Sequence, residues 1–195
     1  MGKRIFTAID ISEEARRKAS AYIDNLRREF PKIRVGWEKP EKLHLTLKFL
    51  GDTSEEQLRK LTEAVEKTTK IISNSGFQKN DFNFQIQGTG VFPSPKRARV
   101  LWLGLIDEKG ILSEINEALE TECERLGFEK ENRKFKPHLT IARLREPQFS
   151  GKLVEKHLQN EFEPVEFEVS EIVIYESKLQ PTGSIYSKVS RFEFF

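Results

Sequence analysis

Two copies of one short polar pattern carry the chemistry that the sequence suggests. The segments 44–47 (His-Leu-Thr-Leu) and 138–141 (His-Leu-Thr-Ile) each read as His, apolar residue, Thr, apolar residue, and they contain two of the three histidines in the 195-residue chain. Side chains two residues apart on a strand share a face, so each His and its Thr point one way while the apolar residues point into a core. If the two copies meet, two imidazoles and two hydroxyls line one site.

Two imidazoles suit the cleavage of a phosphodiester. The reaction needs a base that takes a proton from the attacking oxygen and an acid that protonates the departing oxygen. An imidazole pKa near 6.5 lets one ring be neutral and the other charged near neutral pH. The hydroxyls of Thr46 and Thr140 could bond the non-bridging oxygens, where charge builds in the transition state. A single strand with this pattern more often has a structural role than a catalytic one, and duplication of a structural strand could repeat the pattern. A purely structural role, however, does not explain why both copies contain both the histidine and the threonine.

Three basic residues are weaker candidates for substrate binding. Arg143 follows His138 by five residues, so strict alternation puts it on the opposite face unless the strand ends or bulges first. Lys48 shares the His44 face in a regular strand and could contact phosphate, although a solvent-facing position is favoured. Arg99 begins a predicted strand, where a phosphate contact and a surface ion pair are equally compatible with the pattern.

Four other side chains are interpreted as structural. Trp37 and Tyr186 could stack on bases, as aromatic residues do in single-strand recognition, but burial is the more common role. Phe49 falls on the side of Leu45 and is predicted in the core. His157 lies in a charged helical stretch without a Thr partner and is predicted at the surface.

The histidine strands belong to an order of elements that occurs twice, the second time about 95 residues after the first. Hydrophobic periodicity and caps predict strands near 5–9, 43–50, 82–88, 99–106, 138–141, 165–169, 172–175 and 185–195, and helices near 12–30, 53–72, 111–126 and 152–159. We therefore predict an α+β fold with two pseudo-symmetric lobes, each a small, mostly antiparallel sheet with outer helices, and an active-site cleft between them. The chain is one domain, 1–195, with lobes of about 1–95 and 96–195; strand exchange between the lobes is left open.

Composition narrows the class of protein. A net charge of +2 and 37% hydrophobic residues permit a packed core, and the longest apolar runs are far too short to cross a membrane. The single cysteine, Cys123, cannot form an internal disulfide, and no secretory signal is visible, so we expect a cytoplasmic protein. Neither a Cys/His cluster with metal-ligand spacing nor a glycine-rich phosphate loop is visible, so we expect no metal and no cofactor.

The paired motifs resemble those of the 2H phosphoesterases, and within them the RNA 2′,3′-cyclic phosphodiesterase (2′-5′ RNA ligase-like) branch. The supporting stretches are residues 6–10, 45–51, 90–93, 99–102 and 181–186. The resemblance implies hydrolysis of a terminal 2′,3′-cyclic phosphate on RNA to a 2′-phosphate without a metal. It implies that His44 is the proton donor to the departing 3′ oxygen, that His138 is the proton acceptor that activates water, and that an Arg in the place of Arg143 contacts phosphate. Some relatives also join RNA ends reversibly through a 2′-5′ bond.

Two alternatives stay open at this point. The substrate could be another small cyclic phosphodiester, or the chain could be a non-catalytic module that binds RNA ends. The partner we expect is an RNA end that carries a 2′,3′-cyclic phosphate. We expect the protein to be a monomer that does not act at a membrane.

Overall fold

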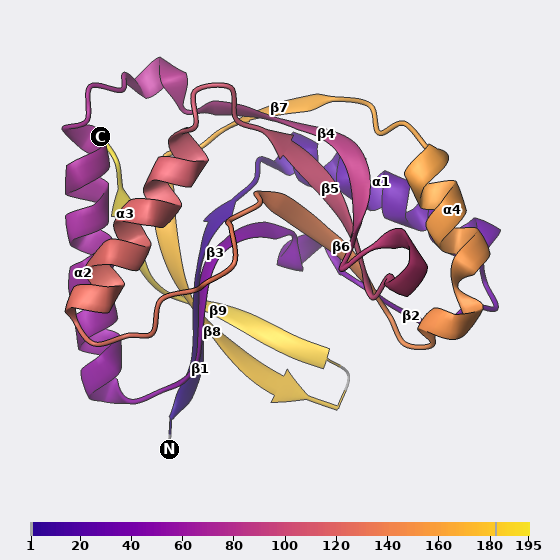
Figure 1. Ribbon diagram of the computed structural model, residues 1–195, viewed down its shortest axis with the longest axis horizontal. Helices are drawn as coiled ribbons and strands as arrows, with labels where there is room; N and C mark the ends of the chain where they lie inside the picture. Colours follow the sequence, from indigo (N-terminus) through magenta and orange to yellow (C-terminus); the bar gives the residue numbers. More distant parts are fainter. Residues whose placement is uncertain (1, 182) are drawn as a thin grey trace.

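The computed structural model describes residues 2–181 and 183–195, and it confirms the α+β class (Figure 1). Thr182, part of one stretch that supports the family resemblance, lies outside the described residues. The strands are β1 (Lys3–Asp10), β2 (Val35–Trp37), β3 (His44–Thr53), β4 (Asn83–Phe92), β5 (Val100–Ile106), β6 (His138–Leu144), β7 (Val165–Glu168), β8 (Glu171–Gln180) and β9 (Gly183–Glu193). The helices are α1 (Glu13–Glu29), α2 (Glu55–Ser73), α3 (Ile111–Arg125) and α4 (Gly151–Gln159).

The helix ends follow from local sequence signals. The Ser12 hydroxyl accepts a hydrogen bond from the backbone N–H of Ala15 and caps α1. Ser54 and Gln57 form a reciprocal capping box at the start of α2. Gly127, just beyond α3, has a φ of 92°, a left-handed conformation that glycine adopts without strain. These caps place the helices where the sequence predicts them.

All the strands pair antiparallel in one curled sheet of order β7-β4-β5-β6-β3-β1-β8-β9, and β2 pairs with β6. The sheet has two similar halves, β6-β5-β4-β7 and β3-β1-β8-β9, and each half begins with a histidine strand. The halves meet where Leu45 of β3 pairs with Leu139 of β6. The two predicted sheets are therefore parts of one continuous sheet.

Each half of the sheet contains strands from both the N-terminal and the C-terminal part of the sequence. β8 lies beside β1 and carries β9 on its other side, and β4 lies beside β5, so strands from either side of residue 95 share a half. The helices are exchanged as well. α2 and α3 cover the half that contains β3, β8 and β9, and α1 and α4 cover the half that contains β4 and β7 (Figure 1). Neither half of the sheet is therefore made of one half of the sequence alone.

The main core lies between the sheet and its helices. The four apolar residues of the two motifs, Leu45, Leu47, Leu139 and Ile141, belong to it. A smaller cluster around Phe6, which includes Ala8, Val173, Tyr175 and Tyr186, lies apart from this core. The motif histidines and threonines project from the face of the sheet away from the helices. This face is called the catalytic face below, after the chemistry that the sequence predicts for these side chains. Among the described residues, no helix is long and apolar enough to cross a membrane.

Candidate active site

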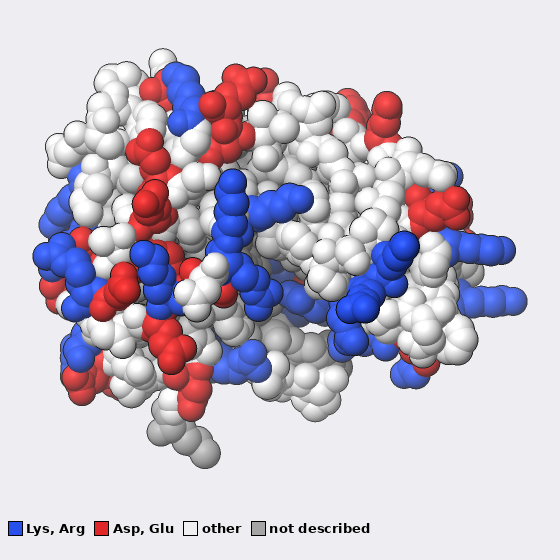
Figure 2. All heavy atoms as spheres, in the orientation of Figure 1, with Lys and Arg blue, Asp and Glu red and all other residues white. Residues whose placement is uncertain are grey.

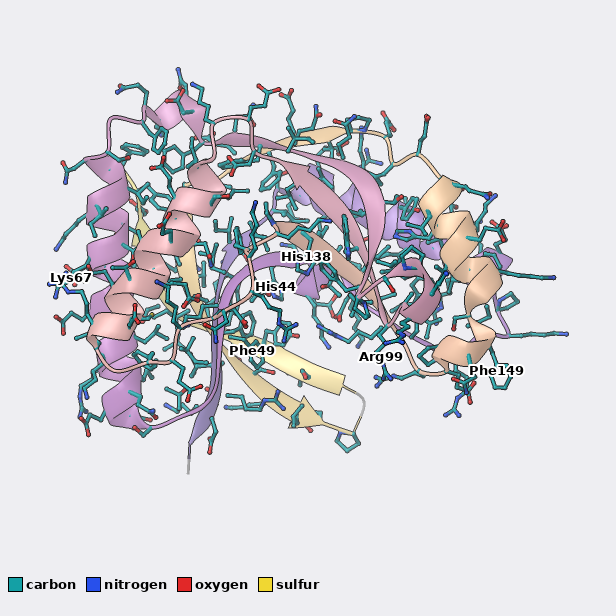
Figure 3. All side chains as sticks on the ribbon, in the orientation of Figure 1. His44, Phe49, Lys67, Arg99, His138 and Phe149 are labelled. Carbon is teal, nitrogen blue, oxygen red and sulfur yellow. The ribbon has the colours of Figure 1, made fainter. Side chains whose placement is uncertain are left out.

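The pairing of β3 with β6 brings the two motifs together. Because Leu45 lies opposite Leu139 in antiparallel register, His44 lies beside Thr140 and Thr46 beside His138, all four on the catalytic face. In a regular ladder, diagonal neighbours are about 7–8 Å apart, which is within reach of one phosphate for two long side chains. Figure 3 shows the His44 and His138 labels next to each other at the middle of the molecule.

Both imidazoles are held in the same tautomer. The Nδ1 atom of His44 is 2.6 Å from the carbonyl oxygen of Lys42, and that of His138 is 2.8 Å from the carbonyl oxygen of Lys136. A carbonyl only accepts, so each Nδ1 carries a proton and each neutral ring keeps the lone pair on Nε2. Nε2 of His44 is 3.0 Å from Thr46 Oγ1. The Nε2 atoms are therefore the ones available to exchange protons with a substrate.

Burial keeps both rings neutral in the free protein. Loss of hydration lowers the pKa of His44 to about 4, against smaller opposing effects of the hydrogen bond to the Lys42 carbonyl and of the Asp10 carboxylate. Loss of hydration also lowers the pKa of His138, and the nearby charges of Arg143 and Lys136 act in the same direction. An anion bound between the rings would raise both pKa values, because it stabilises the imidazolium form.

A β-bulge follows the threonine in each histidine strand. The register of β1 with β3 shifts so that Thr7 pairs with Lys48 and Ala8 with Thr46, which leaves Leu47 as an extra residue. The register of β5 with β6 shifts in the same way at Ile141. After each bulge the alternation of faces is reversed. Two consecutive residues of each strand are buried, and the residue five positions after each histidine returns to the catalytic face.

Arg143 therefore lies on the same face as His138, which meets the condition that the sequence set for it. Its side chain is exposed, and its Nε atom is 3.7 Å from a carboxylate oxygen of Glu38. Its charge lowers the pKa of both His44 and His138, so the guanidinium lies near both rings. The site thus contains a fixed cation beside the two imidazoles.

The same reversal makes two expectations wrong. Lys48 neither faces solvent nor shares the His44 face: it is 7% exposed, and its Nζ lies 2.6 Å from Glu120 Oε2 and 2.8 Å from the carbonyl oxygen of Glu129. Phe49 is 57% exposed rather than buried in the core. Its ring stacks on Phe6 with centroids 5.9 Å apart, and Phe6 stacks on His44 at 4.9 Å.

Arg99 is exposed and precedes β5, and its carbonyl oxygen accepts a hydrogen bond from the backbone N–H of Leu144. It therefore lies beyond the far end of β6 from His138. Figure 3 places its label away from the two histidines. A phosphate contact by Arg99 stays a prediction.

The expectation for His157 is also wrong, because the side chain is fully buried. Its Nε2 lies 3.0 Å from the carbonyl oxygen of Gly90 and 3.2 Å from that of Trp102, so Nε2 carries a proton and donates. The Tyr22 hydroxyl, 2.9 Å from Nδ1, donates to that atom. His157 thus ties α4 to the β4–β5 ladder just past a shift in its register.

Aromatic side chains that the motif analysis did not single out surround the rings. Phe6 and Tyr175 contact the His44 side. On the other side, the Phe92 ring meets His138 edge-on at 4.9 Å, and Lys136 Nζ lies 4.4 Å from the centroid of Trp102. The alternation of side chains along the neighbouring strands could have indicated these aromatic residues. That alternation places them beside the histidines only when the pairing of the strands is known. This apolar surrounding is the physical cause of the lowered histidine pKa values.

The two aromatic residues considered for base stacking, Trp37 and Tyr186, are each partly buried. Tyr186 lies beside His44, with ring centroids 5.5 Å apart, whereas Trp37 lies on β2 opposite Ala142. Lys and Arg side chains gather around the middle of the view in Figure 2, the region where Figure 3 places the histidines. Among the described residues, no group of three or more His, Cys, Asp or Glu side chains could hold a metal ion.

Comparison with known proteins gives one consistent result. Residues 15–180 match the model of the 2′-5′ RNA ligase superfamily. A Methanothermobacter thermautotrophicus protein named RNA 2′,3′-cyclic phosphodiesterase is 35% identical over 98% of this chain and 99% of its own. A Thermotoga maritima protein of the same name is 35% identical over 98% of this chain and 95% of its own.

Solved structures show the same fold. The crystal structure of TT0787 from Thermus thermophilus covers 98% of this chain and 97% of its own, with a TM-score of 0.75 and 26% identity. That of E. coli LigT complexed with 3′-AMP covers 99% and 98%, with a TM-score of 0.70 and 24% identity. The family model spans most of the chain, and relatives 35% identical cover nearly all of it. This chain therefore belongs to the 2′-5′ RNA ligase superfamily of 2H phosphoesterases.

Proposed function

We propose that the protein hydrolyses the 2′,3′-cyclic phosphate at the 3′ end of RNA to a 2′-phosphate. The observation that carries the proposal is the pair of Nε2 atoms, from His44 and His138, set on one face by matching Nδ1–carbonyl bonds. The name that the curated relatives carry, RNA 2′,3′-cyclic phosphodiesterase, supports this substrate.

The proposed reaction is an acid–base displacement at phosphorus. Nε2 of His138 takes a proton from a water molecule, whose oxygen forms a bond to phosphorus. The bond from phosphorus to the 3′ oxygen breaks, and Nε2 of His44 gives its proton to that oxygen, which leaves a 3′-hydroxyl and a 2′-phosphate. The two histidines then return to their starting states by exchange of one proton with solvent.

The assignment of the acid and base roles to the two rings rests on the resemblance to the 2H phosphoesterases, because the charge of Arg143 lowers the pKa of both. Burial, together with the charges of Arg143 and Lys136, lowers the pKa of His138 and keeps it neutral, as a base must be before the reaction. The Asp10 carboxylate offsets a part of the effect of burial on the pKa of His44. Because burial lowers the pKa of His44 to about 4, its protonation at neutral pH depends on the negative charge of the bound cyclic phosphate.

The neighbouring polar groups stabilise the transition state. The hydroxyls of Thr46 and Thr140 lie beside the rings and can donate to the non-bridging oxygens. Arg143 contributes a positive charge on the same face, where negative charge builds. These steps use protein groups only, so we propose that the reaction needs no metal ion.

The test is hydrolysis of an oligonucleotide that ends in a 2′,3′-cyclic phosphate, in the presence of excess chelator. We expect complete conversion to the 2′-phosphate, identified because it differs in chromatographic mobility from the 3′-phosphate. A 3′-phosphate product, or a reaction that stops with chelator and resumes on addition of a divalent metal, contradicts the proposal. Comparison with an ADP-ribose cyclic phosphate tests the alternative of another cyclic phosphodiester. Tight binding without turnover identifies a binding module instead.

A second candidate activity is favoured by the family model itself, that of the 2′-5′ RNA ligase superfamily. If the 5′-hydroxyl of a second RNA replaces the water, the same proton transfers join the two ends through a 2′-5′ bond. Incubation of cyclic-phosphate and 5′-hydroxyl fragments at high concentration tests this reaction. We further propose that the protein is a cytoplasmic monomer; sedimentation checks its size in solution.

A further inference from the structure

A pocket lies apart from the histidine pair, at the sheet edge where β2 meets the end of α1. Its volume is about 700 Å³, and four of the nine residues that line it are arginines: Arg27, Arg28, Arg34 and Arg145. None of the described residues that line it is acidic. It is called the arginine pocket below.

The charge of the arginine pocket is only partly compensated. Arg34 has an exposed ion pair, with its Nη1 atom 3.3 Å from Glu146 Oε1. In the described part of the chain, neither Arg27 nor Arg145 has a carboxylate oxygen within 4.0 Å. Guanidinium groups gathered in this way repel one another and create a positive potential, which favours an anionic ligand.

The arginine pocket is continuous with the catalytic face. Because β6 bulges at Ile141, Arg143 follows His138 on that face. Arg145 lies just beyond β6, and its backbone N–H donates to the carbonyl oxygen of Arg34. Gly36 lies opposite Arg143 in the β2–β6 pair, and a Cβ atom at Gly36 would lie 3.1–3.4 Å from the Arg145 guanidinium. The Arg145 side chain therefore lies across β2, and cations extend from the histidines to the arginine pocket.

The distance identifies the kind of ligand that can use both sites. Arg145 is seven residues from His138, so their backbones are at most about 23 Å apart at a strand rise of about 3.3 Å per residue. A mononucleotide at the histidines cannot span that distance, whereas an oligonucleotide can. Phe30 and Trp37 also line the arginine pocket and offer aromatic surface for a base.

We propose that the arginine pocket binds backbone phosphates of the single-stranded RNA that leads, from its 5′ side, to the cyclic phosphate. The inference rests on the proposed function, because the histidine pair fixes the 3′ end. It makes RNA chains rather than mononucleotides the preferred substrate.

The experiment compares two substrates that end in a 2′,3′-cyclic phosphate: a mononucleotide and an RNA of about ten nucleotides. The variant is Arg27→Gln with Arg145→Gln. Its matched control, Arg59→Gln with Lys67→Gln, removes the same charge from α2, on the other side of the molecule; Figure 3 labels Lys67 there. All the substituted residues are exposed, and thermal melting confirms that each variant is folded.

We expect the Arg27/Arg145 variant to raise KM for the RNA roughly tenfold relative to the mononucleotide. The slope of log(kcat/KM) against log salt for the RNA should become shallower by about 1.4, since each phosphate contact on a single strand contributes about 0.7. The control variant should behave as the wild type does. An RNA-to-mononucleotide ratio that is unchanged in the variant, or equally reduced in the control, overturns the inference. If the wild type hydrolyses neither substrate, the proposed function itself has failed.

Discussion

Arg143 and Phe49 occupy equivalent positions on the two histidine strands. Each follows its histidine by five residues, and each reaches the catalytic face because a bulge has just reversed the alternation of its strand. Both side chains are exposed, but one is a cation and the other is an aromatic ring. The pseudo-symmetric site is therefore chemically asymmetric, with the fixed positive charge on the His138 strand.

The first prediction concerns that charge. Replacing Arg143 by Gln should lower kcat/KM for a cyclic mononucleotide about 100-fold, because it removes a cation that lies near both imidazoles, where negative charge develops. Arg59→Gln is the comparison, since Arg59 is an exposed residue of α2. Its loss should change kcat/KM by less than about threefold. Equal losses in the two variants would show that Arg143 has no special position.

The second prediction concerns the pH dependence of the reaction. The pH profile of kcat/KM reports the free protein, in which the pKa of His44 is about 4 and that of His138 is lowered. The profile should be bell-shaped with its maximum below pH 6.5. The falling limb of the kcat profile should lie at higher pH, because the bound phosphate raises the pKa of the acid. A kcat/KM profile that is flat from pH 4 to 8 contradicts the acid–base pair.

The third prediction concerns stability. Because the folded-state pKa of His44 is below the ordinary value of 6.5, the unfolded chain takes up this proton first as the pH falls. Stability is therefore fully present above pH 6.5 and is lost as the pH falls toward 4, by about 3 kcal/mol for His44. Urea denaturation at pH 7 and 4.5 measures the loss. His44→Gln should be less sensitive to this change of pH, and equal sensitivity would contradict the burial argument.

The fourth prediction separates structure from substrate binding at Lys48. Lys48→Met leaves Glu120 buried without its ion-pair partner and should destabilise the fold by about 3–5 kcal/mol. The double variant Lys48→Met with Glu120→Leu should recover most of this stability and should hydrolyse substrate nearly as the wild type does. A stable double variant with a strongly raised KM would instead place Lys48 in substrate binding.

The sequence predicts the site as far as its alternation stays regular. Leu45 and Leu139 each stand between a histidine and a threonine. Because side chains alternate along a strand, this spacing alone predicts that each histidine and its threonine share a face. The sequence pattern does not predict the bulges. At the first bulge, the Thr7 hydroxyl accepts from the backbone N–H of Lys48 and donates to its carbonyl oxygen, a contact between residues 41 apart in sequence. The faces of Phe49 and Lys48 therefore follow from tertiary contacts.

Two other differences have the same origin. His157 is buried because the carbonyl oxygens of Gly90 and Trp102, from two other strands, accept its proton. β2 is only three residues long and is centred on Gly36, so it lacks the length and the alternation of side chains that indicate a strand. In both places the deciding partner is distant in sequence. The helices were predicted more closely because their caps are local.

The most direct test of the central claim is the rate at which the His44→Ala, His138→Ala and doubly substituted proteins hydrolyse a terminal 2′,3′-cyclic phosphate. If the two Nε2 atoms act as one acid–base pair, each single substitution should lower kcat by about 100- to 10,000-fold, and the double substitution should cost little more than the worse single one. A single variant that is folded and retains the wild-type kcat would contradict the account.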